Sequence, residues 1–290
     1  MYRLKKWINL DNLDKYYLSG NPYAIELLKE YPDEINCYIL SFNKNAISIL
    51  EKNMNSISWD NFSRNENAIH ILEKNFDKIV WYTLSENPNA IHILEKNIDK
   101  INWYTLSKNP NAVHILEKNI NHINWENLSR NENAISILEQ NINKICWYTL
   151  SENPNAIHIL EKHFDKINWF ALSRNPNAIH IIEKNLDKVH WYFLSANPNA
   201  IHILEKNLDK VNWRILSENE NAIHILEQNI DKICWDHILH NPSIFELDFD
   251  ALKKRCSIYK EELIQKAMHP SRIQKYLDEG INIEDLDNYM

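Results

Sequence analysis

The chain has 290 residues, a net charge of −8 and 44% hydrophobic residues. This acidic balance, without a basic stripe, argues against a nucleic-acid binder, and no apolar run approaches the length of a signal-peptide core or a membrane span, so we expect a soluble protein of the cytoplasm. Only two glycines occur, Gly20 and Gly280, which excludes the glycine-rich phosphate loop, the dinucleotide fingerprint and the nucleophile elbow.

The dominant feature is a 22-residue repeat. Tryptophan recurs at this spacing nine times, and the register extends back to two copies in which Lys15 and Cys37 take its place. Eleven copies over residues 15–256 predict one elongated array of stacked units, with residues 1–14 as an N-terminal cap and residues 257–290 as a helical C-terminal cap. The four cysteines show no paired spacing, which predicts free thiols. The nine tryptophans are Trp59, Trp81, Trp103, Trp125, Trp147, Trp169, Trp191, Trp213 and Trp235.

In each copy, the stretch that follows the tryptophan segment carries the signals of a helix, here called helix B. In the copy at residues 81–102, Asn87 is expected to cap the first turn and Pro88 occupies the first helical position. Asn97 stands where a left-handed C-cap belongs. A helical wheel assigns the inner face to Ala90, Ile93 and Leu94 and the outer face to His92, Glu95 and Lys96.

The stretch that bears the tryptophan predicts a second short helix, here called helix A. Asp99 follows the apolar Ile98 and precedes Trp103 by four residues, which is the pattern of a hydrophobic staple around an N-cap, so we expect a helix of about two turns from Asp99 to Ser107. The wheel places Trp103, Leu106 and Ser107 inside and Tyr104, Thr105 and Lys108 outside. Neither helix is stable alone, so stacking must stabilise both. The predicted fold is all-α, an α-solenoid of about eleven helix-turn-helix repeats.

The repeat pattern WxxLSxNPNAIxILExNxDKI, together with the C-terminal stretch from His269 to Ile273 and Tyr276, Leu277 and Gly280, resembles the short helical repeat proteins that giant nucleocytoplasmic large DNA viruses encode in many copies. The repeat match covers about residues 15–256. The resemblance implies a viral protein that acts in the cytoplasm of an infected host cell or as part of the virion. It carries over no activity, cofactor or catalytic residue.

Histidines form a column on the outer face of helix B. They allow a metal-binding or pH-sensing strip, since all would become charged near pH 6.5. However, no cysteine or carboxylate completes a zinc ligand set, and Ser136 replaces the histidine without other change. The favoured interpretation is a solvated face that holds no metal and no cofactor. The column comprises His70, His92, His114, His158, His180, His202 and His224.

Serine, histidine and aspartate recur along the array, whereas a catalytic site needs unlike residues that converge once in a pocket. We therefore expect no enzyme and no catalytic residue. The tryptophans could in principle stack nucleic-acid bases, but they share the apolar face with leucine, so a core position is expected. The candidates that do not repeat lie toward the C-terminus and are interpreted as part of an ordinary cap: His237, His240, Asp248, Asp250, Cys256 and His269.

The outer face of helix A varies from copy to copy, with the tyrosine, arginine and mixed charge that protein-recognition surfaces favour. We predict a non-enzymatic repeat scaffold that binds a host or viral protein through this face, with no membrane partner. The alternative is a structural or assembly component of a virion or a self-associating filament, and the third is a nucleic-acid binder, disfavoured by charge. The predicted protein-binding residues are Asp60, Asn61, Arg64, Tyr82, Thr83, Glu86, Tyr104, Thr105, Lys108, Glu126, Asn127, Arg130, Tyr148, Thr149, Glu152 and Arg214.

Overall fold

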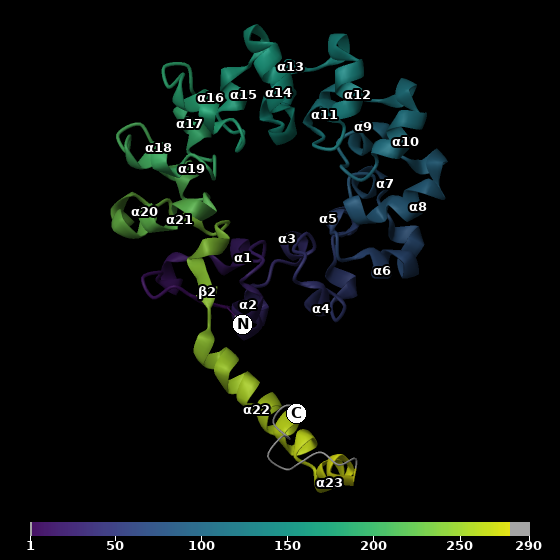
Figure 1. The fold of residues 1–290 in the computed structure, drawn as a ribbon, viewed down its shortest axis with the longest axis vertical. Coiled ribbons are helices and arrows are strands. Elements are labelled where there is room, and N and C mark those ends of the chain that lie inside the picture. Colours follow the sequence, from purple (N-terminus) through teal and green to yellow (C-terminus); the bar gives the residue numbers. More distant parts are fainter. Residues whose placement is uncertain (1, 279–290) are drawn as a thin grey trace. The chain divides into compact units, whose positions relative to one another are not determined.

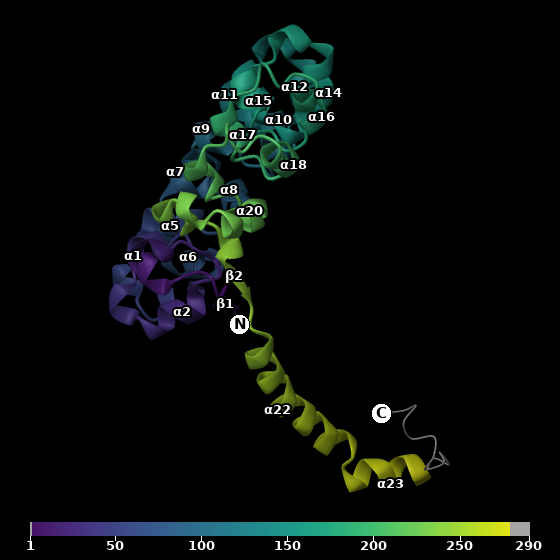
Figure 2. The same cartoon turned by 90° about the vertical axis from the view of Figure 1, so that its left-hand side faces the viewer.

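The computed structural model describes residues 2–278 and divides the chain into two units. One unit comprises Leu4–Phe245, and the other joins the first three residues to the segment from Glu246 onward. The larger unit contains the repeats and is built from pairs of short helices, which confirms the all-α solenoid. Figure 2 shows the A helices and the B helices as two adjoining layers.

The A helices carry odd labels and the B helices carry even labels. The A helices are α1 (Lys15–Leu18), α3 (Cys37–Leu40), α5 (Trp59–Arg64), α7 (Trp81–Leu84), α9 (Trp103–Leu106), α11 (Trp125–Arg130), α13 (Trp147–Glu152), α15 (Trp169–Leu172), α17 (Trp191–Leu194), α19 (Trp213–Leu216) and α21 (Trp235–Ile238). The B helices are α2 (Ile25–Glu30), α4 (Ile47–Leu50), α6 (Ile69–Leu72), α8 (Ile91–Glu95), α10 (Val113–Lys118), α12 (Ile135–Gln140), α14 (Ile157–Lys162), α16 (Ile179–Glu183), α18 (Ile201–Glu205) and α20 (Ile223–Gln228).

Short 3-10 turns form most of the connections between these helices. They are η1 (Leu10–Asn12), η2 (Pro32–Glu34), η3 (Met54–Ser56), η4 (Glu73–Lys78), η5 (Pro88–Ala90), η6 (Ile98–Lys100), η7 (Ile120–His122), η8 (Ile142–Lys144), η9 (Pro154–Ala156), η10 (Phe164–Lys166), η11 (Glu220–Ala222), η12 (Ile230–Lys232) and η13 (Pro242–Ile244).

Each A helix begins at the tryptophan position and not at the residue four places earlier. In α9 the N-cap is Asn102, whose side chain accepts a hydrogen bond from the backbone N–H of Thr105 at 3.0 Å. Asp99 lies in the separate turn η6, and Ile101 between them is extended and buried. The expected helix from Asp99 to Ser107 is therefore wrong at its N-terminal end, because the chain leaves the helical conformation to bury Ile101.

The ends of the B helices also differ from expectation. Asn97 has a φ of −136° and is not left-handed. Its side-chain amide instead donates to the carbonyl of Ile93 at 2.8 Å, which satisfies one of the acceptors that a helix end leaves open. At the other end, the side chain of Asn87 accepts from the backbone N–H of Asn89 and so caps the turn η5, one turn before α8 begins at Ile91.

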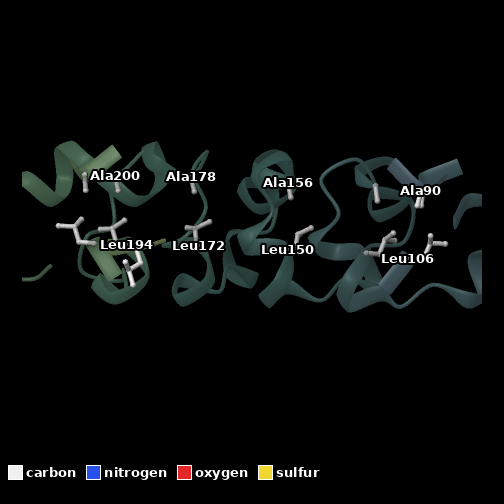
Figure 3. Packing of buried hydrophobic residues seen from close by; sticks show 14 of the residues in the cluster. Ala90, Leu106, Leu150, Ala156, Leu172, Ala178, Leu194 and Ala200 are labelled. Carbon is white, nitrogen blue, oxygen red and sulfur yellow. The ribbon is translucent and has the colours of Figure 1, made fainter. Parts of the chain in front are cut away.

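The core is a double row of small and medium side chains between the two layers. Leucines of the A helices, such as Leu106, face alanines at the start of the B helices, such as Ala90, and both types are fully buried. Figure 3 shows the two facing rows. The expected inner faces of helix B and of Leu106 and Ser107 are confirmed.

The tryptophans lie at the edge of this core and are half-buried, so the expectation of a tryptophan core is wrong in degree. Each indole packs against the core on one side. In five copies a lysine of the next repeat covers the indole, as Lys144 covers Trp125 with its ammonium 4.6 Å from the ring centroid. His122 takes that place on Trp103, stacked at 4.8 Å. The indole is thus shared between a packing role and a cation–π contact.

A buried asparagine ladder joins every repeat to the one before it. In each copy the asparagine that follows helix A donates from Nδ2 to two backbone carbonyls of the preceding repeat, at 2.9–3.2 Å. The members are Asn21, Asn43, Asn65, Asn87, Asn109, Asn131, Asn153, Asn175, Asn197, Asn219 and Asn241, and all are buried.

The ladder closes on itself. Asn21, in the first repeat, donates to the carbonyls of Leu239 and Asn241 in the last, at 2.9 and 3.2 Å. The helices of this unit follow a closed circuit in Figure 1, in which α1 follows α21. The expected elongated array is therefore wrong: the repeats curve until the first and last members become neighbours, and the solenoid is a ring.

Both ends of the repeat region contribute to the closing repeat. In the 22-residue register, the place of the eleventh B helix falls on residues 245–250 or, one full circuit of 242 residues earlier, on residues 3–8. At this place the structure has two short strands, β1 (Tyr2–Leu4) and β2 (Phe245–Leu247), which form a two-stranded sheet. The Lys5 N–H donates to the Ile244 carbonyl at 2.9 Å.

The segment predicted as an N-terminal cap belongs to this closure. Ile8 and Leu13 are buried in the same core cluster as Ile244 and Phe245. The turn η1 also occupies the position that η2 holds one repeat later. The first residues thus complete the last repeat and do not cover an open end.

The smaller unit contains α22 (Phe249–Ala267) and α23 (Pro270–Asp278). Helix α22 crosses the predicted boundary at residues 256–257 without a break. Arg3 pairs with Glu246 at 3.0 Å and lies near Asp250 at 3.5 Å, and the hydrogen bond to Glu246 raises the pKa of its guanidinium. None of the side chains described between residues 246 and 278 is buried, and the predicted role of residues 257–290 as a cap stays a prediction, with residues 279–290 outside the described part.

Candidate protein-binding surface

The candidate surface is the outer side of the A helices, where three positions of each repeat were predicted to point outward. They are the first, second and fifth residues after the tryptophan, for example Tyr104, Thr105 and Lys108 after Trp103. The structure assigns these three positions three different environments.

The first position is exposed in every repeat. Tyr82 and Tyr104 expose about half of their surface, and Tyr148 exposes 42%. Asp60, Glu126 and Arg214 occupy the same position and are exposed as predicted. This position therefore meets the expectation of a free surface.

The same register position adds aromatic residues outside the predicted set. Tyr16 and Tyr38 directly follow Lys15 and Cys37, the residues that replace tryptophan in the first two repeats, and the repeat register itself was the signal that could have identified them. We call the seven aromatic members of the first position the aromatic stripe. They are Tyr16, Tyr38, Tyr82, Tyr104, Tyr148, Phe170 and Tyr192, with exposures of 40–62%.

The second position is not a free surface, and its prediction as an outward position is wrong. Thr83, Thr105, Asn127 and Thr149 are buried, and Thr105 exposes only 1%. Thr105 Oγ1 donates to the Tyr82 carbonyl of the preceding repeat at 2.7 Å. The same contact is made by Thr149 to Glu126 at 2.9 Å, by Asn127 to Tyr104 at 2.6 Å and by the half-buried Asn61 to Tyr38 at 2.9 Å. These side chains connect repeats.

The fifth position carries ion pairs between neighbouring repeats. The Glu86 carboxylate lies between Arg64 at 3.4 Å and Lys108 at 2.6 Å, and Arg130 pairs with Glu152 at 3.1 Å. Because these charges neutralise one another, the surface beside the aromatic stripe is electrically mixed, with no single sign of charge. The fifth position frames the stripe more than it offers unpaired charge.

The stripe is continuous in one sector. Phe170 lies 6.3 Å from Tyr148 and 4.0 Å from Phe193, measured between ring centroids. His190, the residue before Trp191, joins the group at 4.9 Å from Phe170. Other copies have Asn, Ser, Cys or Val at the His190 position, so this sector has an aromatic cluster that the consensus repeat does not.

The histidine column on the B helices has partners of its own. Each of its seven histidines lies within 2.7–3.4 Å of a glutamate in the preceding repeat, as His114 lies 2.8 Å from Glu95. Both members of each pair are about half exposed, so each pair is expected to stabilise the fold only weakly. Within residues 2–278, the structure shows no group of three or more His, Cys, Asp or Glu side chains that could hold a metal ion.

The invariant serine of the A helix has the backbone role that its small size suggested. Ser85 Oγ accepts from the backbone N–H of Asn102 at 3.0 Å and donates to the carbonyl of Trp81 at 2.7 Å. The thiols of Cys37, Cys146, Cys234 and Cys256 are free. Across the described residues, no helix is both long and apolar enough to cross a lipid bilayer.

Comparisons with protein-family models, with curated proteins and with solved structures found no match to this chain.

Proposed function

We propose that the protein is a non-enzymatic scaffold that binds a protein partner through the aromatic stripe on its A helices. The observation that carries this proposal is the contrast within one helix. The first position after the tryptophan is exposed and changes from copy to copy, whereas the second position is buried and tied to the neighbouring repeat. The variable positions are thus displayed on a constant frame.

Tyrosine suits this role for physical reasons. A tyrosine side chain offers a large, amphipathic contact area with few rotatable bonds, and aromatic anchors dominate the binding energy of many interfaces. The stripe is interrupted by Asp60, Glu126, Arg214 and Asp236 at the same register position. Their charges would select among partners by electrostatic complementarity.

The resemblance to giant-virus repeat proteins adds a biological setting to the proposal. In that setting the partner is a host or viral protein, and the scaffold acts in the host cytoplasm or in the virion. Neither the stripe nor the ring depends on this setting, so the binding proposal can be tested without it.

The assembly alternative is narrowed by the closed ring. An open solenoid can grow by stacking its terminal repeat on the terminal repeat of another copy. Here the first and last repeats already bind each other through Asn21, so end-to-end growth of that kind would require the ring to open. The nucleic-acid alternative is disfavoured by the paired charges beside the stripe and by the net charge of −8.

The test compares two surfaces of the same ring. We expect that replacing Tyr82, Tyr104 and Tyr148 by alanine leaves the melting temperature nearly unchanged but weakens partner capture at least about tenfold, since exposed anchors commonly contribute about 1 kcal/mol or more each. The measurement is site-specific photo-crosslinking from position 104 in host cells, followed by affinity measurement with the captured protein.

The matched control replaces His92, His114, His158 and His180 by serine, a residue that already stands at this position as Ser136. This variant should retain capture. Loss of capture in the histidine variant, together with full capture in the tyrosine variant, would assign binding to the B helices and contradict the proposal. A stable oligomer in light scattering that the tyrosine substitutions dissociate would favour the assembly alternative.

A further inference from the structure

A groove recurs where a B helix ends and the next A helix begins. One copy has a volume of about 310 Å³ and is lined by Glu161, Phe164, His180, Ile181, Lys184 and Asn185. The next copy, of about 230 Å³, has the corresponding residues of the following repeat, including Glu183 and His202. In both copies the His–Glu pair spans the groove, at 3.0 Å and 2.7 Å.

The copy between the first two repeats is different. It is a pocket of about 390 Å³ lined by Lys29, Pro32, Ile35, Cys37, Ser48, Ile49, Lys52 and Asn53. Subtracting six repeats of 22 residues from the copy at residues 161–185 aligns each of its lining residues with one of these. The pocket is therefore a modified copy of the general groove, at the lower end of the volume range typical of ligand sites.

The modifications remove the groups that occupy this place elsewhere. Cys37 stands where most repeats have tryptophan, so the indole is missing. Ser56 stands where Lys188 covers the indole of Trp169, so the covering ammonium is missing as well. Ser48 replaces the histidine of the His–Glu pair. The first repeat does not share this vacancy, since Lys15 contacts Glu34 and the ring of Tyr31 there.

The charge of the pocket is also reversed relative to the general groove. Lys29 takes the place of Glu161, and Lys52 corresponds to Lys184. The pocket lining thus has two ammonium groups and no carboxylate. Lys29 also bonds the exposed Glu26 at 2.9 Å, outside the lining. On a chain with a net charge of −8, this is a local site for an acidic ligand.

We infer that this pocket binds an aromatic side chain of a partner protein, flanked by acidic residues. The ring would enter the space that tryptophan fills in other repeats and pack on Ile35 and Ile49. The lysines would contact its face and pair with the flanking carboxylates. This site is separate from the aromatic stripe, and the inference stands whether or not the stripe binds a partner.

The test uses a blocked tripeptide with tryptophan between two glutamates as the probe and Cys37 as the reporter. We expect saturating probe to slow alkylation of Cys37 in the full-length protein by about tenfold, because the bound ring shields the thiol. Mass spectrometry resolves each cysteine, and the exposed Cys256 should react at an unchanged rate. The same peptide with alanine in place of tryptophan should give little protection.

Two variants locate the site. Cys37→Trp restores the residue of the other repeats and should abolish probe binding in calorimetry, with an unchanged or raised melting temperature. Lys29→Glu keeps the pocket open and restores the usual glutamate, and should weaken binding by about tenfold through loss of one charge contact. Equal protection by the alanine peptide, an unprotected Cys37, or full binding by either variant would overturn the inference.

Discussion

The asparagine and tryptophan ladders both occur once per repeat, yet they are built to different tolerances. The asparagine position has the same residue in all eleven repeats, whereas the tryptophan position has lysine and cysteine in the first two. The asparagines are buried and form hydrogen bonds on both sides, whereas the tryptophans are half-buried at the edge. The difference teaches that the most visible residue of a repeat need not be the one that constrains its geometry most.

The physical reason is the asymmetry between hydrogen bonding and apolar contact. Asn131 donates to the carbonyls of Ser107 and Asn109 and accepts from the N–H of Asn133, so its amide satisfies three backbone groups. If a buried partner is removed, each orphaned group keeps its full desolvation cost. A half-exposed indole leaves a vacancy that water or another side chain can fill, as Lys15 and Cys37 illustrate.

The largest expected effect follows from breaking the asparagine ladder. We predict that Asn131→Ala lowers the free energy of unfolding by about 3–5 kcal/mol, because it leaves two buried carbonyls and one buried N–H unpaired. Chemical denaturation measures the change. The control is Asn133→Ala, at an exposed side chain with a single bond to the Pro110 carbonyl at 3.0 Å, which should cost about 1 kcal/mol. Equal effects would show that burial of the ladder does not matter.

The second prediction concerns ring closure. In an open array Asn21 would lie at a free end, and its replacement would cost little. In the closed ring it donates to Leu239 and Asn241, so Asn21→Ala should lower the free energy of unfolding by about 2–4 kcal/mol. Hydrogen exchange should also increase in the last repeat, more than 200 residues away in sequence. If exchange rises only in the first two repeats, the array is open in solution.

The third prediction concerns the tryptophan ladder. Trp125→Ala should cost about 2–3 kcal/mol, below the usual range for a fully buried aromatic, because the indole is half exposed and loses one cation–π contact with Lys144. A thermal melt with the Asn131→Ala variant beside it gives the order directly. A larger loss for Trp125 than for Asn131 would reverse the ranking of the two ladders.

The smallest expected effect is on the outer face of the B helices. His114→Ser removes one half-exposed pair with Glu95 and should change stability by no more than about 0.5 kcal/mol. Denaturation at low and high salt measures it, and any loss should shrink as salt screens the pair. A loss comparable to that of Trp125→Ala would show that the histidine column holds the repeats together.

The period, the helix pairs and most of the core could be predicted from the sequence, because each repeats with the same phase in every copy. Closure could not be predicted, since it depends on a rotation of about 33° per repeat that arises from small differences in helix packing. The clue was the asparagine itself. Its capping role explains one hydrogen bond, whereas its presence in all eleven repeats reflects two more across the repeat boundary.

The candidate surface was predicted in part, for a related reason. A helical wheel distinguishes an inner face from an outer face, but a helix in a stacked array is also covered on its flanks. Thr105 lies on such a flank, so a correct wheel still assigned it to solvent. Tyr104 points away from the flanks and from the core, and its exposure followed from the wheel alone. Lys29 and Cys37 were overlooked because departures from the consensus resemble decay at the end of an array.

Closure also fixes how many units the protein can contain. An open array can gain or lose a copy by duplication or deletion of 22 codons, since a new terminal unit needs only one neighbour. In this ring an added twelfth unit would require every junction to relax from about 33° to about 30° of rotation, or else separate Asn21 from Asn241. Changes of length are therefore selected against as strongly as changes in the core, and the chain can diversify only by substitution within a constant number of copies.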